Sequence, residues 1–104
     1  MQLVGYSNAT GSAARFNWPN SVAVDSNGNV YVTDYNNNAV RKITPGGVVT
    51  TVAGSNASFG VVTGNLPGSL SGPSAVAIIG GTGPALRLAI ADALESTVLR
   101  AALP

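Results

Sequence analysis

Residues 21–34 read SVAVDSNGNVYVTD, and their pattern predicts the fold class. Its first part alternates side chains as a β-strand does, with Val22 and Val24 on one face. Asn27-Gly28 supplies the positive-φ positions of a tight hairpin turn. Residues 30–34 are β-branched and aromatic, which is typical of a second strand. The stretch therefore predicts an antiparallel hairpin.

Two further strands are expected immediately after this hairpin. Residues 39–44 and 48–54 are again rich in β-branched side chains, and the turn between them reads Pro45-Gly46-Gly47. Four antiparallel strands joined by tight turns form a meander, which is the blade unit of a β-propeller.

The same pattern recurs later in the chain. The recurrence has a period of roughly 50 residues, which lies at the propeller end of the range for repeat proteins. The matching segments are 19–24 with 73–78, 30–34 with 88–92, and 40–42 with 98–100. The sequence thus predicts a second blade after the first.

Residues 85–102 also admit a helical interpretation. Leu86, Ile90, Leu94 and Val98 are spaced by four, and the segment is rich in helix-forming residues. Taken alone, this segment would be read as an amphipathic helix. Its register match to the first blade favours strands instead, and both interpretations are kept as expectations.

The order of residues over 14–54 closely resembles the NHL repeat. The matching residues are Ala14-Arg15-Phe16-Asn17, Pro19, Val22-Ala23-Val24-Asp25, Gly28-Asn29-Val30-Tyr31-Val32, Asp34, Arg41-Lys42-Ile43 and the run from Gly47 to Gly54. Residues 71–102 resemble the repeat more weakly, since Leu99 replaces Arg41 and Leu94-Glu95-Ser96 replaces three asparagines. The resemblance implies an all-β fold of four-stranded antiparallel blades that belong to a six-bladed propeller.

Two blades are too few to close such a ring. At the repeat length above, six blades need roughly 270–300 residues, and the chain has 104. We therefore expect a homotrimer. In it, residues 1–6 supply the outer strand of a neighbour's blade, 14–54 form the first blade, and 55–104 form a divergent second blade that lacks its own outer strand.

Composition excludes several kinds of chemistry. The chain has no cysteine and no histidine, which excludes a Ser-His-Asp triad and a zinc site of Cys or His ligands within one chain. The net charge of +1 argues against nucleic acid as a partner. Residues 1–11 lack the features of a signal peptide, and no apolar run has the length of a membrane span. We expect a soluble chain with no membrane partner and leave its compartment open.

Candidate ligand-binding residues lie at one end of the predicted blades, here called the top face. They are Arg15, Asn17, Trp18, Asn20, Tyr35 and Asn37. Trp18 offers a stacking surface, and packing between blades is its structural alternative. Asp34 and Asp92 end matching strands, and we expect each to accept backbone N–H bonds from the turn that follows.

Two functions remain open from the sequence. The first is an oligomeric module that binds a small ligand or a partner on its top face or in the central channel. The second is a cation-dependent hydrolase of esters, lactones or phosphotriesters, as the resemblance implies for some propellers. Calcium is the one cofactor considered, with Asn20 as candidate ligand, and Glu95 is the candidate catalytic acid.

Overall fold

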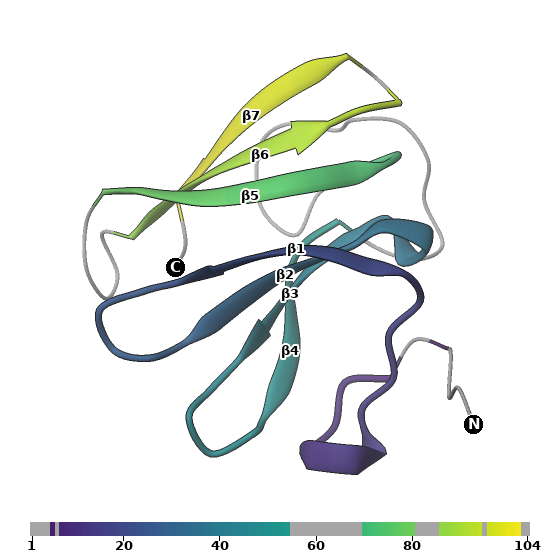
Figure 1. Ribbon diagram of the computed structural model, residues 1–104, viewed down its shortest axis with the longest axis vertical. Helices are drawn as coiled ribbons and strands as arrows, with labels where there is room; N and C mark the ends of the chain where they lie inside the picture. Colours follow the sequence, from purple (N-terminus) through teal and green to yellow (C-terminus); the bar gives the residue numbers. More distant parts are fainter. Residues whose placement is uncertain (1–4, 6, 55–69, 81–85, 95, 103–104) are drawn as a thin grey trace.

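The structure, a computed structural model, describes residues 5, 7–54, 70–80, 86–94 and 96–102. Two antiparallel sheets pack against each other (Figure 1). Their elements are, in chain order, η1 (Gly11–Ala13), β1 (Pro19–Val24), β2 (Val30–Asp34), η2 (Tyr35–Asn37), β3 (Ala39–Ile43), β4 (Val49–Gly54), β5 (Pro73–Gly80), β6 (Arg87–Asp92) and β7 (Thr97–Ala102). The all-β prediction is confirmed.

Each sheet is a simple meander. Strands β1 to β4 pair in chain order in the first sheet, and β5 to β7 do so in the second. The strand interpretation of 85–102 is confirmed for its described residues, since β6 and β7 pair from Arg87 to Ala102. The fourth strand expected for each blade is present in the first sheet. In the described part of the second sheet there are three, and completion by a neighbour stays a prediction.

The two sheets begin with the same irregularity. Pro19 lies opposite Asp34 and Pro73 lies opposite Asp92, and a register shift follows each proline. Proline has no N–H to donate to the ladder, so it is suited to the first position of a strand or to a bulge. The internal repeat predicted from the sequence is therefore also a repeat of backbone geometry.

The hydrophobic core lies between the sheets. Strands β1 and β2 pack against β5, with the first strands of the two sheets side by side (Figure 1). The buried residues of the core are Tyr31, Val40, Ala53, Leu70, Val76, Leu86, Leu88 and Ile90. Each sheet contributes one face, so the core is an interface between two sheets rather than the interior of either one.

Residues 7–16, here called the N-terminal segment, lie against the opposite face of the first sheet. The Gly11 N–H donates to the Gly47 carbonyl at 2.9 Å, and the Val49 N–H donates to the Ala9 carbonyl at 2.8 Å. Just before the segment, the Gly5 N–H donates to the Phe16 carbonyl at 2.9 Å. Residues 1–4 and 6 lie outside the described residues, so the strand assigned to 1–6 stays a prediction.

Among the residues that the structure describes, no helix has the length and apolar character needed to cross a membrane.

Candidate functional site

A buried ion pair anchors the top end of the first sheet. Asp34 Oδ2 lies 2.7 Å from Arg41 Nη1, and both side chains are fully buried. Asn37 Nδ2 donates to the same carboxylate oxygen at 2.7 Å, and the Asn17 N–H donates to Asp34 Oδ1 at 2.7 Å. A buried pair is stable only when further hydrogen bonds satisfy its remaining atoms, and these bonds do so.

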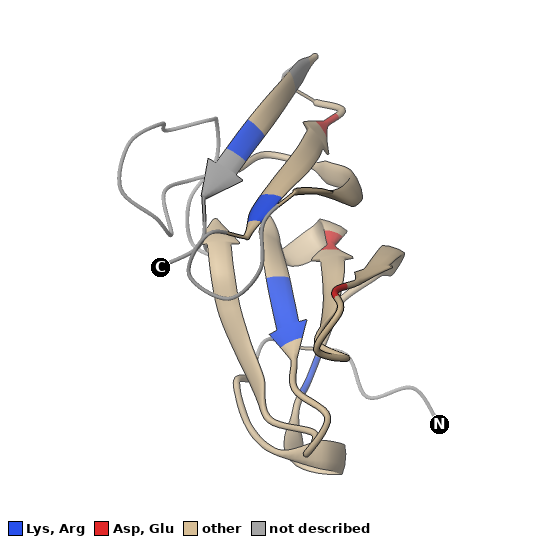
Figure 2. Cartoon of the chain, turned by 90° about the vertical axis from the view of Figure 1, so that its left-hand side faces the viewer, with Lys and Arg blue, Asp and Glu red and all other residues tan. Residues whose placement is uncertain are grey.

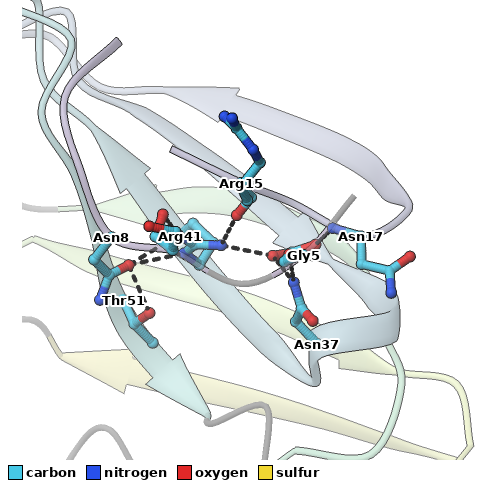
Figure 3. A network of polar contacts seen from close by, with 9 residues as sticks. Gly5, Asn8, Arg15, Asn17, Asn37, Arg41 and Thr51 are labelled. Atoms are coloured by element: carbon cyan, nitrogen blue, oxygen red, sulfur yellow. Dashed lines mark hydrogen bonds and ion pairs between the residues drawn. The ribbon is translucent and has the colours of Figure 1, made fainter. Parts of the chain in front are cut away.

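The same arginine holds the N-terminal segment onto the sheet (Figure 3). Its guanidinium donates to the carbonyls of Ser7 at 2.8 Å and Arg15 at 2.9 Å, and to Asn8 Oδ1 at 2.9 Å. The guanidinium carbon also lies 4.7 Å from the centre of the Phe16 ring, which is a cation–π contact. Arg41 therefore connects strand β3 to a segment far from it in sequence.

The loop before β1 meets η2 at the top face, and each contributes one amide and one aromatic residue. The Asn36 N–H donates to the Asn17 carbonyl at 3.0 Å, and the Tyr35 N–H donates to the Trp18 carbonyl at 3.2 Å. Asn36 Nδ2 donates to Asn17 Oδ1 at 3.3 Å. The rings of Trp18 and Tyr35 lie 6.2 Å apart, tilted by 54°. We call Asn17, Trp18, Tyr35 and Asn36 the aromatic–amide cluster.

Trp18 has an unfavourable backbone and an exposed side chain. Its φ is +63°, and 66% of its surface is accessible. The left-handed region costs a bulky residue on the order of 1 kcal/mol or more. In the second sheet, Gly72 occupies the matching position before Pro73. Gly72 does not share the positive φ, and a Cβ there would lie 2.6 Å from Leu94 Cγ, so the two positions differ in backbone conformation. Trp18 therefore carries backbone strain while its side chain stays exposed.

Three predicted ligand residues are engaged elsewhere. The Asn37 amide is buried and donates to Asp34 and to the Gly5 carbonyl. The Arg15 guanidinium donates to the carbonyls of Ser12 and Ala14, and it points away from Asn17 in Figure 3. Asn20 Oδ1 accepts a 2.6 Å hydrogen bond from the Thr33 hydroxyl. The structure thus brings together Asn17, Trp18 and Tyr35, but not the whole predicted set.

The two matching aspartates accept backbone N–H bonds, but from a different loop than expected. Asp92 accepts from Ser71 at 2.7 Å and from Gly72 at 3.0 Å, as Asp34 accepts from Asn17. These donors precede the first strand of each sheet, whereas the prediction named the turn after the second. The correction follows from the register, because each proline that opens a sheet lies opposite an aspartate.

Asp25 organises the other end of the first hairpin. Burial raises the pKa of Asp25, but hydrogen bonds from Asn29, Asn27 and the Tyr31 hydroxyl outweigh that effect and lower it below its usual value. Burial, and secondarily the Asp25 carboxylate, raises the pKa of Tyr31 to about 12. The hydrogen bonds to Asp25 stabilise this turn, and neither group adjoins the aromatic–amide cluster in sequence.

The calcium and catalytic predictions find no cluster of ligands. Within the part of the chain that the structure describes, no group of three or more His, Cys, Asp or Glu side chains is placed to hold a metal ion. Glu95 lies outside the described residues. Sequence reasoning missed the role of Arg41, although alternation along 39–43 places Arg41 on the sheet face opposite that of Val40 and Lys42, which was a signal for it.

Comparison with known proteins supports the repeat. Residues 16–43 match the family model described as NHL repeat. No curated protein matches the chain. A protein of Bacteroides thetaiotaomicron named "Putative phosphatase" matches with a TM-score of 0.74 and 25% identity over 94% of this chain.

Two further solved structures are similar. An auxiliary nutrient binding protein from Bacteroides ovatus matches 94% of the chain with a TM-score of 0.77 and 25% identity. One of that description from Bacteroides thetaiotaomicron matches 86% with a TM-score of 0.70 and 23% identity. The matched regions cover 24%, 26% and 24% of these three larger chains, so this chain spans about a quarter of their length.

Proposed function

Because residues 16–43 form an NHL repeat and the fold is of the NHL β-propeller type, we propose that this chain is a propeller module. It packs head to tail with two further copies into a six-bladed ring, and its top face binds a small molecule.

The exposed apolar residues on the outer sheet faces support the proposed ring. In the interface between the blades, the face of the second blade with Val76, Leu88 and Ile90 is buried. The corresponding face of the first blade carries Val22 and Val24, which are 63% and 59% exposed. By the matching registers, Val22 stands where Val76 stands in the second blade.

The far face of the second blade also corresponds to a face that is packed within the chain. The first blade buries Tyr31 and Val40 against its neighbour, whereas the second blade exposes Val98 and Ile79 on its far side. The N-terminal segment covers the first blade's outer face around Arg41, so the open part of that face lies on β1. This part and the far side of the second blade each correspond to a face that is already packed within the chain. A second copy can dock on either one as the two blades dock on each other, and repeated head-to-tail contacts close into a ring when the rotation allows it.

The solution mass tests the ring. Light scattering on a sizing column should give three times the 10.3 kDa chain mass. Val22→Asp and Val98→Asp should each dissociate the ring, since each places a carboxylate in an apolar interface. Ser26→Asp, in an exposed turn, is the matched control and should leave the mass unchanged. A folded wild-type monomer would contradict the ring.

The aromatic–amide cluster, in which Trp18 and Asn36 are exposed, supports the ligand-binding part. Two of the similar structures are described as nutrient binding proteins, which fits a module that captures a small molecule. The cluster combines a ring surface with polar groups that fix orientation, as small-molecule sites do.

A cation-dependent hydrolase is the second candidate, since another similar structure is named as a phosphatase. In that case the ring should hydrolyse esters, lactones or phosphotriesters, lose activity with a chelator, and lose it with Asn20→Ala or Glu95→Gln. Absence of turnover with calcium present would leave binding as the function.

A further inference from the structure

The aromatic–amide cluster has a chemistry that selects a class of ligand. We propose that Asn17, Trp18, Tyr35 and Asn36 bind a neutral, hydroxyl-rich ring, that is, a saccharide. The inference rests on the top-face ligand site proposed above and specifies what that site takes.

The aromatic pair provides two apolar faces at an angle. The rings of Trp18 and Tyr35 are 6.2 Å apart and tilted by 54°, so they are not stacked on each other. A sugar ring presents C–H groups on one face, and the electron-rich face of an aromatic ring attracts them. The indole N–H and the phenol hydroxyl add polar groups at the ring edges.

The amide pair provides hydrogen bonds of both kinds. Asn36 Nδ2 and Asn17 Oδ1 bind each other at 3.3 Å, which uses one donor hydrogen and one acceptor lone pair. A side-chain amide has two donor hydrogens and two lone pairs, so the pair retains capacity for further bonds. Hydroxyl groups donate and accept, and they match such a mixed set better than a purely accepting or purely donating ligand does.

Charge argues for a neutral ligand. The nearest charged side chains in the network, Asp34 and Arg41, are fully buried and bound to each other. The Arg15 guanidinium is bound to the carbonyls of Ser12 and Ala14. Figure 2 shows the few charged positions spread over both sheets rather than gathered in a patch. An anion or a metal ion would therefore find no opposite charge in the cluster itself.

The backbone of Trp18 is strained although its indole is exposed. Its φ is +63° and two-thirds of its surface is accessible, so burial of the side chain does not offset the strain. Strain retained at an exposed side chain is characteristic of binding sites, where it fixes a group in the orientation that a ligand needs.

Fluorescence of Trp18, the only tryptophan, gives a direct readout. The assembled wild-type protein is titrated with glucose, N-acetylglucosamine, maltose and cellobiose, and in parallel with inorganic phosphate and glucose 6-phosphate. We expect a saturable change with at least one neutral saccharide and none with phosphate. Asn36→Ala should weaken that affinity about tenfold, the loss of about one hydrogen bond. Ser26→Ala, at the other end of the blade, is the matched control.

The outcomes separate the two proposals. A saturable change with phosphate alone would overturn the saccharide assignment and leave a top-face ligand site in place. No change with any saccharide, while acrylamide still quenches Trp18 in the assembled protein, would overturn the saccharide assignment as well. A Trp18 shielded from acrylamide in the ring would show that the cluster packs between blades, and would overturn both.

Discussion

The two blades of this chain share their backbone geometry at the first strand and differ in the side chains that contact its aspartate. Both open with a proline followed by a register shift, and both place an aspartate opposite that proline. In the first blade the aspartate also pairs with Arg41, whereas Leu99 occupies that register position in the second. An aspartate that accepts backbone N–H bonds is therefore common to both blades, and the arginine of the first blade adds attachment of the N-terminal segment.

The largest effect should come from making the first blade resemble the second. Arg41→Leu leaves the Asp34 carboxylate buried without its cation, and we expect a loss of about 3–5 kcal/mol in the free energy of unfolding. Urea denaturation measures it. The double variant with Asp34→Asn should be less destabilised than the sum of the two single variants, because the pair acts as a unit. Strict additivity would show that the pair is not coupled.

Removing the shared carboxylate from the second blade should cost less. Asp92→Ala leaves the N–H groups of Ser71 and Gly72 without this acceptor, which we expect to cost about 1–3 kcal/mol. Asp34→Ala should cost more, since it also strands a buried guanidinium. If urea denaturation gives the same loss in the free energy of unfolding for both variants, Arg41 does not make the aspartate of the first blade more important than that of the second.

Alkaline pH should affect the first blade selectively. The pKa of Tyr31 is raised from 10.0 to about 12, so the folded state favours the neutral phenol. The contribution of neutral Tyr31 to the free energy of unfolding is complete below pH 10 and is lost as the pH rises to 12. About 1 kcal/mol of it is lost by pH 11. Tyr31→Phe should abolish this loss in thermal melts. The second blade has Ala89 at this place and offers no such group.

The smallest effect should come from Trp18→Gly, which again copies the second blade. Relief of the left-handed strain offsets the lost contact with Tyr35, and we expect a change below about 1 kcal/mol in urea denaturation. Saccharide binding, followed by calorimetry because the fluorophore is gone, should disappear. A loss above about 2 kcal/mol would instead mark Trp18 as a packing residue.

Local sequence patterns predicted the strands well, because alternation and turn residues act over a few positions. The sequence of residues 85–102 fits either a helix or two strands, because its apolar residues are spaced by four. The pairing of β6 with β7 shows that the segment forms strands. The burial of Asn37 and the donors to Asp34 were missed for a similar reason. They depend on contacts between segments distant in sequence, whereas the exposed Trp18 and the half-buried Tyr35 flank turns that the pattern located.

Arg41 also affects how the first blade unfolds locally. Its guanidinium holds the carbonyls of Ser7 and Arg15, so lifting the N-terminal segment would leave a buried cation without these acceptors. Partial detachment of that segment is then nearly as costly as unfolding the sheet beneath it. The amide protons of Gly11 and Arg15 should accordingly exchange with deuterium as slowly as those of β3. Residues with little regular secondary structure would thus belong to the same cooperative unit as the strands.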